Sequence, residues 1–297
     1  KVLSASNTAG TLTYEYASDN QVLSTVKLGG QAVAVPVYNS AGDMTSVSYP
    51  SGAGNAGNAT SGVFTRDAWL RESKVSWSGP GGVITSDEVS RDVSDRIVDQ
   101  VTDGVDPLPG GFNYTYQTSS VGGLGVGSYR LVGATVWSPS GPQTYSYSFA
   151  DKDLSCGAGS GVAQSAGRNS NRSAKTGPSG SVTYCYDQAD KLVSTSDTGV
   201  GAVGYDTRGN MTTVGGETHS YDVADRHLST VKGSTTVSYT RDVTDRIIQR
   251  VASGETTVRY NYSGSGDAAD FVTTTGGALV EASYTLPGGV LLTWRTG

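Results

Sequence analysis

The residues best suited to chemistry in this chain are aspartates that occur in pairs, three positions apart. Two carboxylates at a fixed distance are the usual machinery of glycoside hydrolysis. A catalytic pair is needed only once in a chain, whereas an aspartate that shapes a turn can recur in every copy of a repeated unit. Recurrence therefore favours a structural role for these pairs, which are Asp92 with Asp95, Asp222 with Asp225, and Asp242 with Asp245.

The only two histidines, His219 and His227, lie eight residues apart and are expected on adjacent strands of one hairpin. A metal held by these imidazoles would need a third ligand, and the sequence offers no obvious one. No Walker loop, His-Glu-x-x-His or Gly-x-Ser-x-Gly motif is present. We therefore expect no metal, no cofactor and no enzymatic activity.

Two cysteines, Cys156 and Cys185, are candidates for a disulfide. The bond would close a 29-residue separation around a polar loop and would contribute roughly 3 kcal/mol in an exported protein. The alternative is two unpaired cysteines, one of them buried in a strand. We expect a protein that is secreted or displayed at the cell surface.

The elements that carry these residues are best seen in the stretch Tyr205-Asp-Thr-Arg-Gly-Asn-Met. Tyr205 suits the end of a half-buried strand. The Asp206 side chain can bond the backbone two residues further on, and Gly209 can adopt the positive φ of a tight turn. Met211 then opens the returning strand. The stretch predicts one β-hairpin.

This hairpin unit recurs at intervals near 20 residues, which is typical of one supersecondary unit per repeat. The shared aspartate steps by 19, 16 and 20 residues, and the last turn position holds Gly once and Asp three times. Asp tolerates the left-handed backbone region better than most residues. The four copies are centred on Tyr186 with Asp187, Tyr205 with Asp206 and Gly209, Tyr221 with Asp222, and Asp242.

The N-terminal half repeats the same order of units. Tyr14-Glu-Tyr-Ala matches the Tyr184 copy, and Tyr38 with Gly42 matches the Tyr205 copy. Asp67-Ala-Trp-Leu-Arg resembles the Tyr221 copy more loosely, whereas the segment around Asp92 matches that around Asp242 almost residue for residue. We therefore expect a single array over 1–297, with duplicated halves at approximately 1–120 and 180–265 and a Gly/Ser-rich loop insertion at 157–181.

Composition agrees with an all-β chain of many turns. Gly occurs 41 times and Tyr 17 times, and no stretch shows convincing helical periodicity. The net charge of −6 and the absence of a Lys/Arg run disfavour nucleic-acid binding. No apolar run approaches the ~18 residues of a membrane span, so membrane insertion is not expected.

The repeated Tyr-Asp-x-x-Gly-x-Met/Leu unit resembles the YD repeat of the RHS family. This family includes bacterial polymorphic-toxin shells, insecticidal toxin-complex shells and animal teneurins. The resemblance covers most of the chain and is strongest from Tyr184 to Leu292. It implies consecutive antiparallel β-hairpins that form a curved spiral sheet, part of a hollow shell, and it marks the chain as a segment of a larger shell.

The resemblance also implies a function. In toxin members of the family the shell encloses an effector, so the expected role is a non-enzymatic scaffold. Its partners would be the flanking YD repeats of the same polypeptide and an enclosed effector domain. The alternative is a bacterial cell-surface adhesion or carbohydrate-binding module. For that role, aromatic side chains would form a stacking surface, and the candidates are Trp69, Trp77, Trp137 and Trp294.

Overall fold

The computed structural model describes residues 3–7, 10–19, 21–108, 110–117, 130–149 and 171–296. Every regular element in these ranges is a β-strand. Within each sheet the strands lie in chain order, so consecutive strands are antiparallel neighbours. The all-β class and the chain of consecutive hairpins predicted from the sequence are therefore confirmed. The described residues contain no helix long and apolar enough to cross a membrane.

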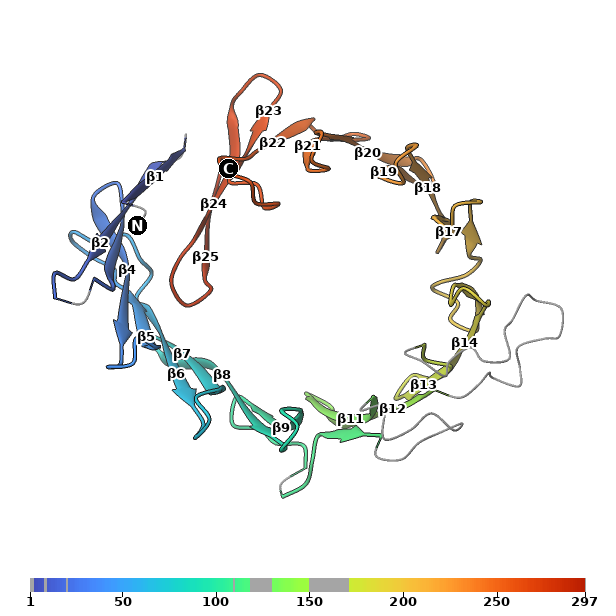
Figure 1. The fold of residues 1–297 in the computed structure, drawn as a ribbon, viewed down its shortest axis with the longest axis horizontal. Coiled ribbons are helices and arrows are strands. Elements are labelled where there is room, and N and C mark those ends of the chain that lie inside the picture. Colours follow the sequence, from blue (N-terminus) through green and yellow to red (C-terminus); the bar gives the residue numbers. More distant parts are fainter. Residues whose placement is uncertain are drawn as a thin grey trace. The chain divides into compact units, whose positions relative to one another are not determined.

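The first of three sheets has nine strands, joined by hairpins (Figure 1). Its strands are β1 (Ser4–Asn7), β2 (Gly10–Tyr16), β3 (Leu23–Leu28), β4 (Gln31–Tyr38), β5 (Met44–Tyr49), β6 (Thr60–Arg66), β7 (Glu72–Gly79), β8 (Gly82–Arg91) and β9 (Ile97–Thr102).

The second sheet has six strands. They are β10 (Tyr114–Tyr116), β11 (Leu131–Ser138), β12 (Gly141–Ser148), β13 (Ala174–Gly177), β14 (Gly180–Tyr186) and β15 (Leu192–Thr195). The loop predicted for 157–181 is wrong at its C-terminal end, because β13 and the start of β14 lie there. In this strand Lys175 pairs with Val182 and Thr176 pairs with Ser181, and the polar composition of the segment concealed the pairing. Residues 157–170 lie outside the described ranges.

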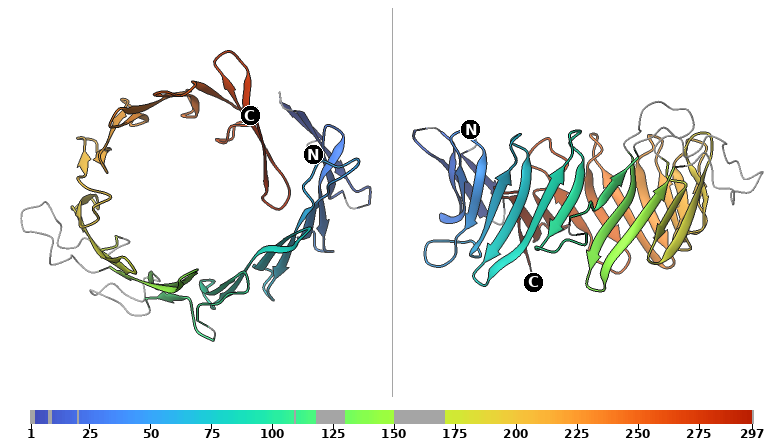
Figure 2. Two further views of the ribbon diagram at one scale, coloured as in Figure 1. Left: turned by 180° about the vertical axis from the view of Figure 1, so that it is seen from behind. Right: turned by 90° about the horizontal axis from the view of Figure 1, so that it is seen from below.

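The third sheet has ten strands, and within each part of the chain alternate strands run in opposite directions, so that turns gather at two edges (Figure 2). The strands are β16 (Gly204–Tyr205), β17 (Met211–Val214), β18 (Glu217–Tyr221), β19 (His227–Lys232), β20 (Thr235–Arg241), β21 (Ile247–Ala252), β22 (Val258–Asn261), β23 (Phe271–Thr274), β24 (Leu279–Thr285) and β25 (Leu291–Arg295).

Contacts divide the chain into two compact units. The first comprises residues 1–88, 102–104 and 239–297, and the second comprises 89–101 and 105–238. The first unit holds an apolar core, in which side chains of β2 to β5 pack on the β24–β25 hairpin. Its buried members are Leu12, Val26, Val33, Ala34, Val47, Tyr49, Ala282, Tyr284 and Leu286.

Two hydroxyl groups and one glycine fix the β24–β25 hairpin against the N-terminal strands. Tyr49 donates a hydrogen bond to the Pro287 carbonyl, and Tyr284 donates to the Gly10 carbonyl at 3.4 Å. Gly288 has φ of +85°, and a Cβ there would lie 2.9 Å from the Val47 side chain. Only glycine fits this close approach, so Gly288 allows the Leu286-Pro-Gly-Gly turn to pack directly against β5.

Candidate functional site

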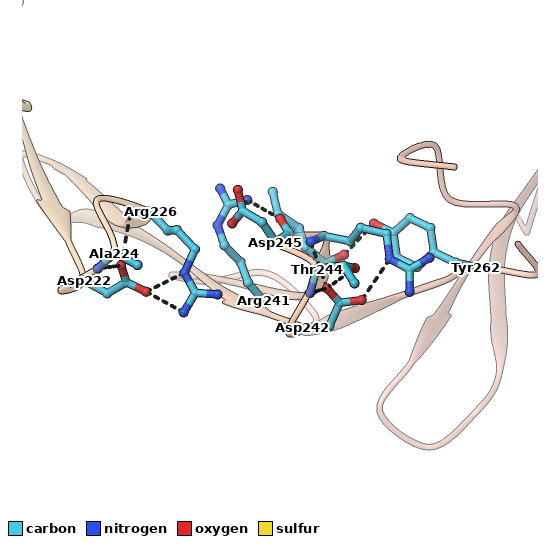
Figure 3. Close-up of polar contacts among 10 residues, drawn as sticks. Asp222, Ala224, Arg226, Arg241, Asp242, Thr244, Asp245 and Tyr262 are labelled. Atoms are coloured by element: carbon cyan, nitrogen blue, oxygen red, sulfur yellow. Dashed lines mark hydrogen bonds and ion pairs between the residues drawn. The ribbon is translucent and has the colours of Figure 1, made fainter. Parts of the chain in front are cut away.

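The aspartate turns are the places where the potentially reactive residues gather, and the turn at Asp242 shows their construction (Figure 3). Its Oδ1 accepts hydrogen bonds from the backbone N–H groups of Thr244 at 2.9 Å and Arg246 at 3.0 Å. Its Oδ2 accepts one from Arg246 Nε at 2.8 Å. The Asp245 N–H donates to the Asp242 carbonyl, which closes the turn. One carboxylate thus organises five consecutive residues.

The same backbone bonds recur at seven turns of the described chain. In each turn the side-chain oxygen of an Asp or Asn accepts N–H groups from the residues two and four positions further on. In four turns that fourth residue is an arginine, whose Nε donates to Oδ2 at 2.7 or 2.8 Å. The seven residues are Asn39, Asp67, Asp92, Asp187, Asp206, Asp222 and Asp242.

A positive φ occurs three positions after the Asp or Asn of every one of these turns, at the residue just before the second N–H donor. The sequence places Gly209 there in one copy, with φ of +94°, and an aspartate in others. Asp245 adopts φ of +72° and Asp225 +62°, as the tolerance of Asp for this region allows. Leu70 at +65° is a larger exception, because an apolar residue gains no local hydrogen bond in that conformation.

The turn hydrogen bonds lower the pKa of five of these carboxyl groups, those of Asp67, Asp92, Asp206, Asp222 and Asp242. At Asp222, the Arg226 side chain is the main cause, followed by its backbone N–H. At Asp242, partial desolvation raises the pKa, but bonds from Thr244 and Arg246 outweigh it and bring the pKa to about 2. Carboxylates that stay ionised and bonded at neutral pH are poorly suited to exchange protons with a substrate. Their geometry instead suits them to hold a turn.

A second repeated contact joins five of the described hairpins to the one before. Tyr205 donates its hydroxyl proton to the Leu192 carbonyl at 3.0 Å, and Tyr221 donates to the Met211 carbonyl at 2.8 Å. In each case the acceptor lies five residues after the aspartate of the preceding turn. We call this contact the tyrosine link. It is also made by Tyr116 to Ile97 and by Tyr262 to Ile247. Tyr186 makes the same bond to Arg172, before which the chain lies outside the described residues.

Cations of the turns pack on the rings of these tyrosines. The Arg246 guanidinium, bound to Asp242, lies 4.6 Å from the centre of the Tyr262 ring, and Arg96 lies 4.9 Å from that of Tyr116. Such contacts are worth about 0.5–1 kcal/mol at exposed sites. Carboxylate, cation and ring thereby connect one turn to the next unit of the array.

Several residues singled out from the sequence fall into these turns. Tyr38 ends β4, and Gly42 occupies the positive-φ position with φ of +89°. The residue that organises this turn is Asn39, whose Oδ1 accepts the N–H groups of Ala41 and Asp43. The sequence reading missed Asn39 because it differs from the shared aspartate, although its place after Tyr38 marks it.

Gln117 and Arg130 make two of the bonds of an Asp turn, although twelve residues separate them in the sequence. The Gln117 N–H donates to the Arg130 carbonyl at 2.9 Å, and Arg130 Nε donates to Gln117 Oε1 at 3.1 Å. These bonds match those of an Asp turn, with Gln in place of Asp and with residues 118–129 inserted. Tyr116-Gln117 before the insertion and Arg130-Leu131 after it are the signal that sequence spacing alone obscured.

The two histidines do lie on adjacent strands, β18 and β19, with ring centres 5.6 Å apart. His219 Nδ1 and His227 Nε2 each lie 3.0 Å from the Thr230 hydroxyl. A side-chain hydroxyl thus occupies the point where the two rings converge. Among the described residues, no three His, Cys, Asp or Glu side chains are arranged to hold a metal ion.

Cys185 is buried in β14, with 6% of its surface exposed. Cys156 lies outside the described residues, so the pairing of the two cysteines stays a prediction. Of the four tryptophans, Trp77 packs between Tyr49 and Phe64, with ring centres about 6 Å away. Trp69, by contrast, is 75% exposed, and Trp137 and Trp294 are also exposed.

Comparisons with known proteins give structural likenesses only. No family model matches the chain, and no curated protein matches it. A solved Photorhabdus luminescens Tc holotoxin pore superposes with a TM-score of 0.46 at 13% identity, over 98% of this chain and 17% of that one.

Two related complexes give similar values. A TcdB2–TccC3 complex has a TM-score of 0.44 at 12% identity, over 96% of this chain and 18% of that one. A TcdB2–TccC3–Cdc42 complex has a TM-score of 0.43 at 12% identity, over 96% and 17%. The chain spans less than a fifth of the length of each of these proteins.

Proposed function

We propose that this chain is a non-enzymatic structural segment, a stretch of hairpin wall that works with flanking repeats of the same polypeptide to enclose a toxin-like effector. The observation that carries the proposal is the seven-fold recurrence of one turn geometry. Side chains that could perform chemistry are used to fix that geometry and to join adjacent hairpins. Quasi-one-dimensional arrays gain stability from such nearest-neighbour contacts. We also propose that the protein acts outside the cell that produces it.

The test uses the complete polypeptide encoded by the reading frame that carries this chain. We expect limited proteolysis under native conditions to leave a protected domain, which becomes cleavable when two turns are opened by Asp222→Ala and Asp242→Ala. Asp267→Ala, at an exposed aspartate outside the seven turns, serves as the control. Equal cleavage of every other domain in the wild-type and double-variant proteins would count against enclosure.

A second candidate function is surface adhesion through carbohydrate binding. Trp69 favours it, because its ring is 75% exposed at a turn tip, with the Arg71 guanidinium 5.0 Å from the ring centre. Exposed aromatic rings can stack on sugars. Binding to a glycan array that is lost in Trp69→Ala and kept in Trp77→Phe would support this function, whereas absence of binding by the wild-type protein would reject it.

A further inference from the structure

An open cleft of about 550 Å³ lies in the second unit, near the ends of the two segments 118–129 and 150–170 that lie outside the described residues. It is lined by residues that flank those segments, and two of them carry a guanidinium group. The lining residues are Arg130, Leu131, Tyr147, Phe149, Asn171, Arg172 and Tyr186. The turn arginines also pack on aromatic rings, but Arg96 and Arg246 each bond a carboxylate there, whereas no carboxylate of the described residues lines this cleft.

Arg172 departs from the repeat at this cleft. Its carbonyl accepts the tyrosine link from Tyr186 at 2.9 Å. At the same position, the two following units carry Leu192 and Met211, so the link itself needs only a backbone carbonyl. An arginine side chain here is therefore not required by the array.

The Arg172 guanidinium is held in place by two aromatic rings. It lies 5.3 Å from the centre of the Tyr147 ring and 5.2 Å from that of the Tyr184 ring. Packing between rings fixes the plane of the group without satisfying its donors. The cation is thus oriented before any ligand arrives, which lowers the entropic cost of binding.

The polar atoms of this pair lack partners among the residues that the structure describes. Arg172 Nε and Asn171 Nδ2 are both covered from solvent and have no hydrogen-bond partner there. Arginines of the turns differ, since Arg226 and Arg246, for example, each bond a carboxylate. Unpartnered covered donors cost free energy. A group that accepts hydrogen bonds and carries negative charge would remove that cost.

We propose that this cleft binds a small carboxylate ligand, with Arg172 and Asn171 as the donors that recognise it. A guanidinium edge presents two parallel N–H groups that match the two oxygens of a carboxylate. The Asn171 amide adds a neutral donor, and the aromatic lining suits a carboxylate carried on a ring. Of the two guanidinium groups, that of Arg130 already donates to Gln117 Oε1. This leaves Arg172 and the amide for the anion, which suits a monoanion better than a phosphate dianion. The site does not depend on the proposed scaffold function.

The test follows the NMR signals of the Asn171 amide and the Arg172 Nε–H in the whole chain at fixed ionic strength. Acetate supplies the carboxylate alone, glucuronate supplies it on a ring, and glucose lacks it. We expect saturable shifts with acetate and glucuronate and none with glucose. Arg172→Gln should weaken glucuronate binding about tenfold or more, because a charge-assisted pair is lost. Asn171→Ala, which keeps the cation, should weaken it less.

The matched control is Arg259→Gln, which removes the same charge from an exposed arginine on β22. It should leave glucuronate binding unchanged. Equal losses in the Arg172 and Arg259 variants would overturn the proposal in favour of general charge attraction. Equal shifts with glucose, tighter binding of inorganic phosphate than of either carboxylate, or no saturable shift at all would also overturn it. Thermal unfolding of each variant confirms that the binding measurement reports on folded protein.

Discussion

The tyrosine link at Tyr262 offers a sharp test of how adjacent hairpins are held together. The Tyr262 hydroxyl donates to the Ile247 carbonyl at 2.7 Å, and so connects the residue after β22 to the first residue of β21. Removing the hydroxyl by Tyr262→Phe keeps the ring that packs on Arg246 and deletes only the hydrogen bond. Tyr260→Phe, two residues earlier in β22, is the matched control, because the Tyr260 hydroxyl has no hydrogen-bond partner among the described residues.

A hydrogen bond between uncharged groups contributes about 1 kcal/mol net to stability. A loss of 1 kcal/mol corresponds to an about fivefold larger population of the locally opened state. The amides that should report this opening belong to the β21–β22 pair, where Gln249 faces Arg259 and Arg250 faces Val258. Because each hairpin contacts mainly its neighbours, the effect should fade within one or two units.

The assay is amide hydrogen exchange under native conditions, which reports local opening free energies residue by residue. We expect exchange at β21–β22 to be about fivefold faster in Tyr262→Phe and unchanged in Tyr260→Phe. Exchange in β2 to β5 should not respond to either change. Equal acceleration in the two variants, or no acceleration in Tyr262→Phe, would refute the view that the hydroxyl joins adjacent hairpins.

Further predictions concern the turns and the cysteines. Gly209→Ala should destabilise the protein by about 1 kcal/mol in chemical denaturation, because a Cβ is disfavoured at φ of +94°. Gly266→Ala, where φ is not positive and no atom lies within 4 Å of an added Cβ, should be nearly neutral. The pKa of Asp242 falls from 3.8 to about 2 on folding, so its contribution to stability should be complete above pH 3.8 and lost as the pH falls through 2. Unfolding curves of wild type and Asp242→Asn should therefore converge in that window. Non-reducing peptide mapping should find Cys156 joined to Cys185, and reduction should cost roughly 3 kcal/mol; two free thiols would disprove the pairing.

The hairpin units could be predicted from the sequence because the turn chemistry is local. Tyr205, Asp206 and Gly209 each have a backbone role that spacing alone reveals, and positive φ at Asp225 and Asp245 follows from the tolerance of aspartate. Leu70 could not be foreseen in the same position, since its residue type argues against that conformation. There the bonds of Asp67 determine the turn and override the preference of the leucine.

Long-range contacts were beyond sequence reasoning. The hydrogen bond from Tyr49 to Pro287 joins residues 238 positions apart, and neither residue type marks the other as its partner. Insertions had a similar effect, because residues 118–129 separate Gln117 from Arg130 and break the spacing by which a turn is recognised. Nothing in the sequence indicated that the Arg172 side chain has a separate role, because its carbonyl accepts the tyrosine link like that of any other residue at that position.

The tyrosine link also implies an order in which the hairpins are completed during synthesis. Each acceptor carbonyl precedes its donor in the sequence, by 13 residues from Leu192 to Tyr205 and by 10 from Met211 to Tyr221. During synthesis at about 5–20 residues per second, a hairpin would wait only seconds for the hydroxyl that completes it. Each unit that carries this link therefore secures the one before it. Along that stretch a nascent chain would gain order toward the ribosome, whereas the core of β2 to β5 is completed only when the β24–β25 hairpin has been made.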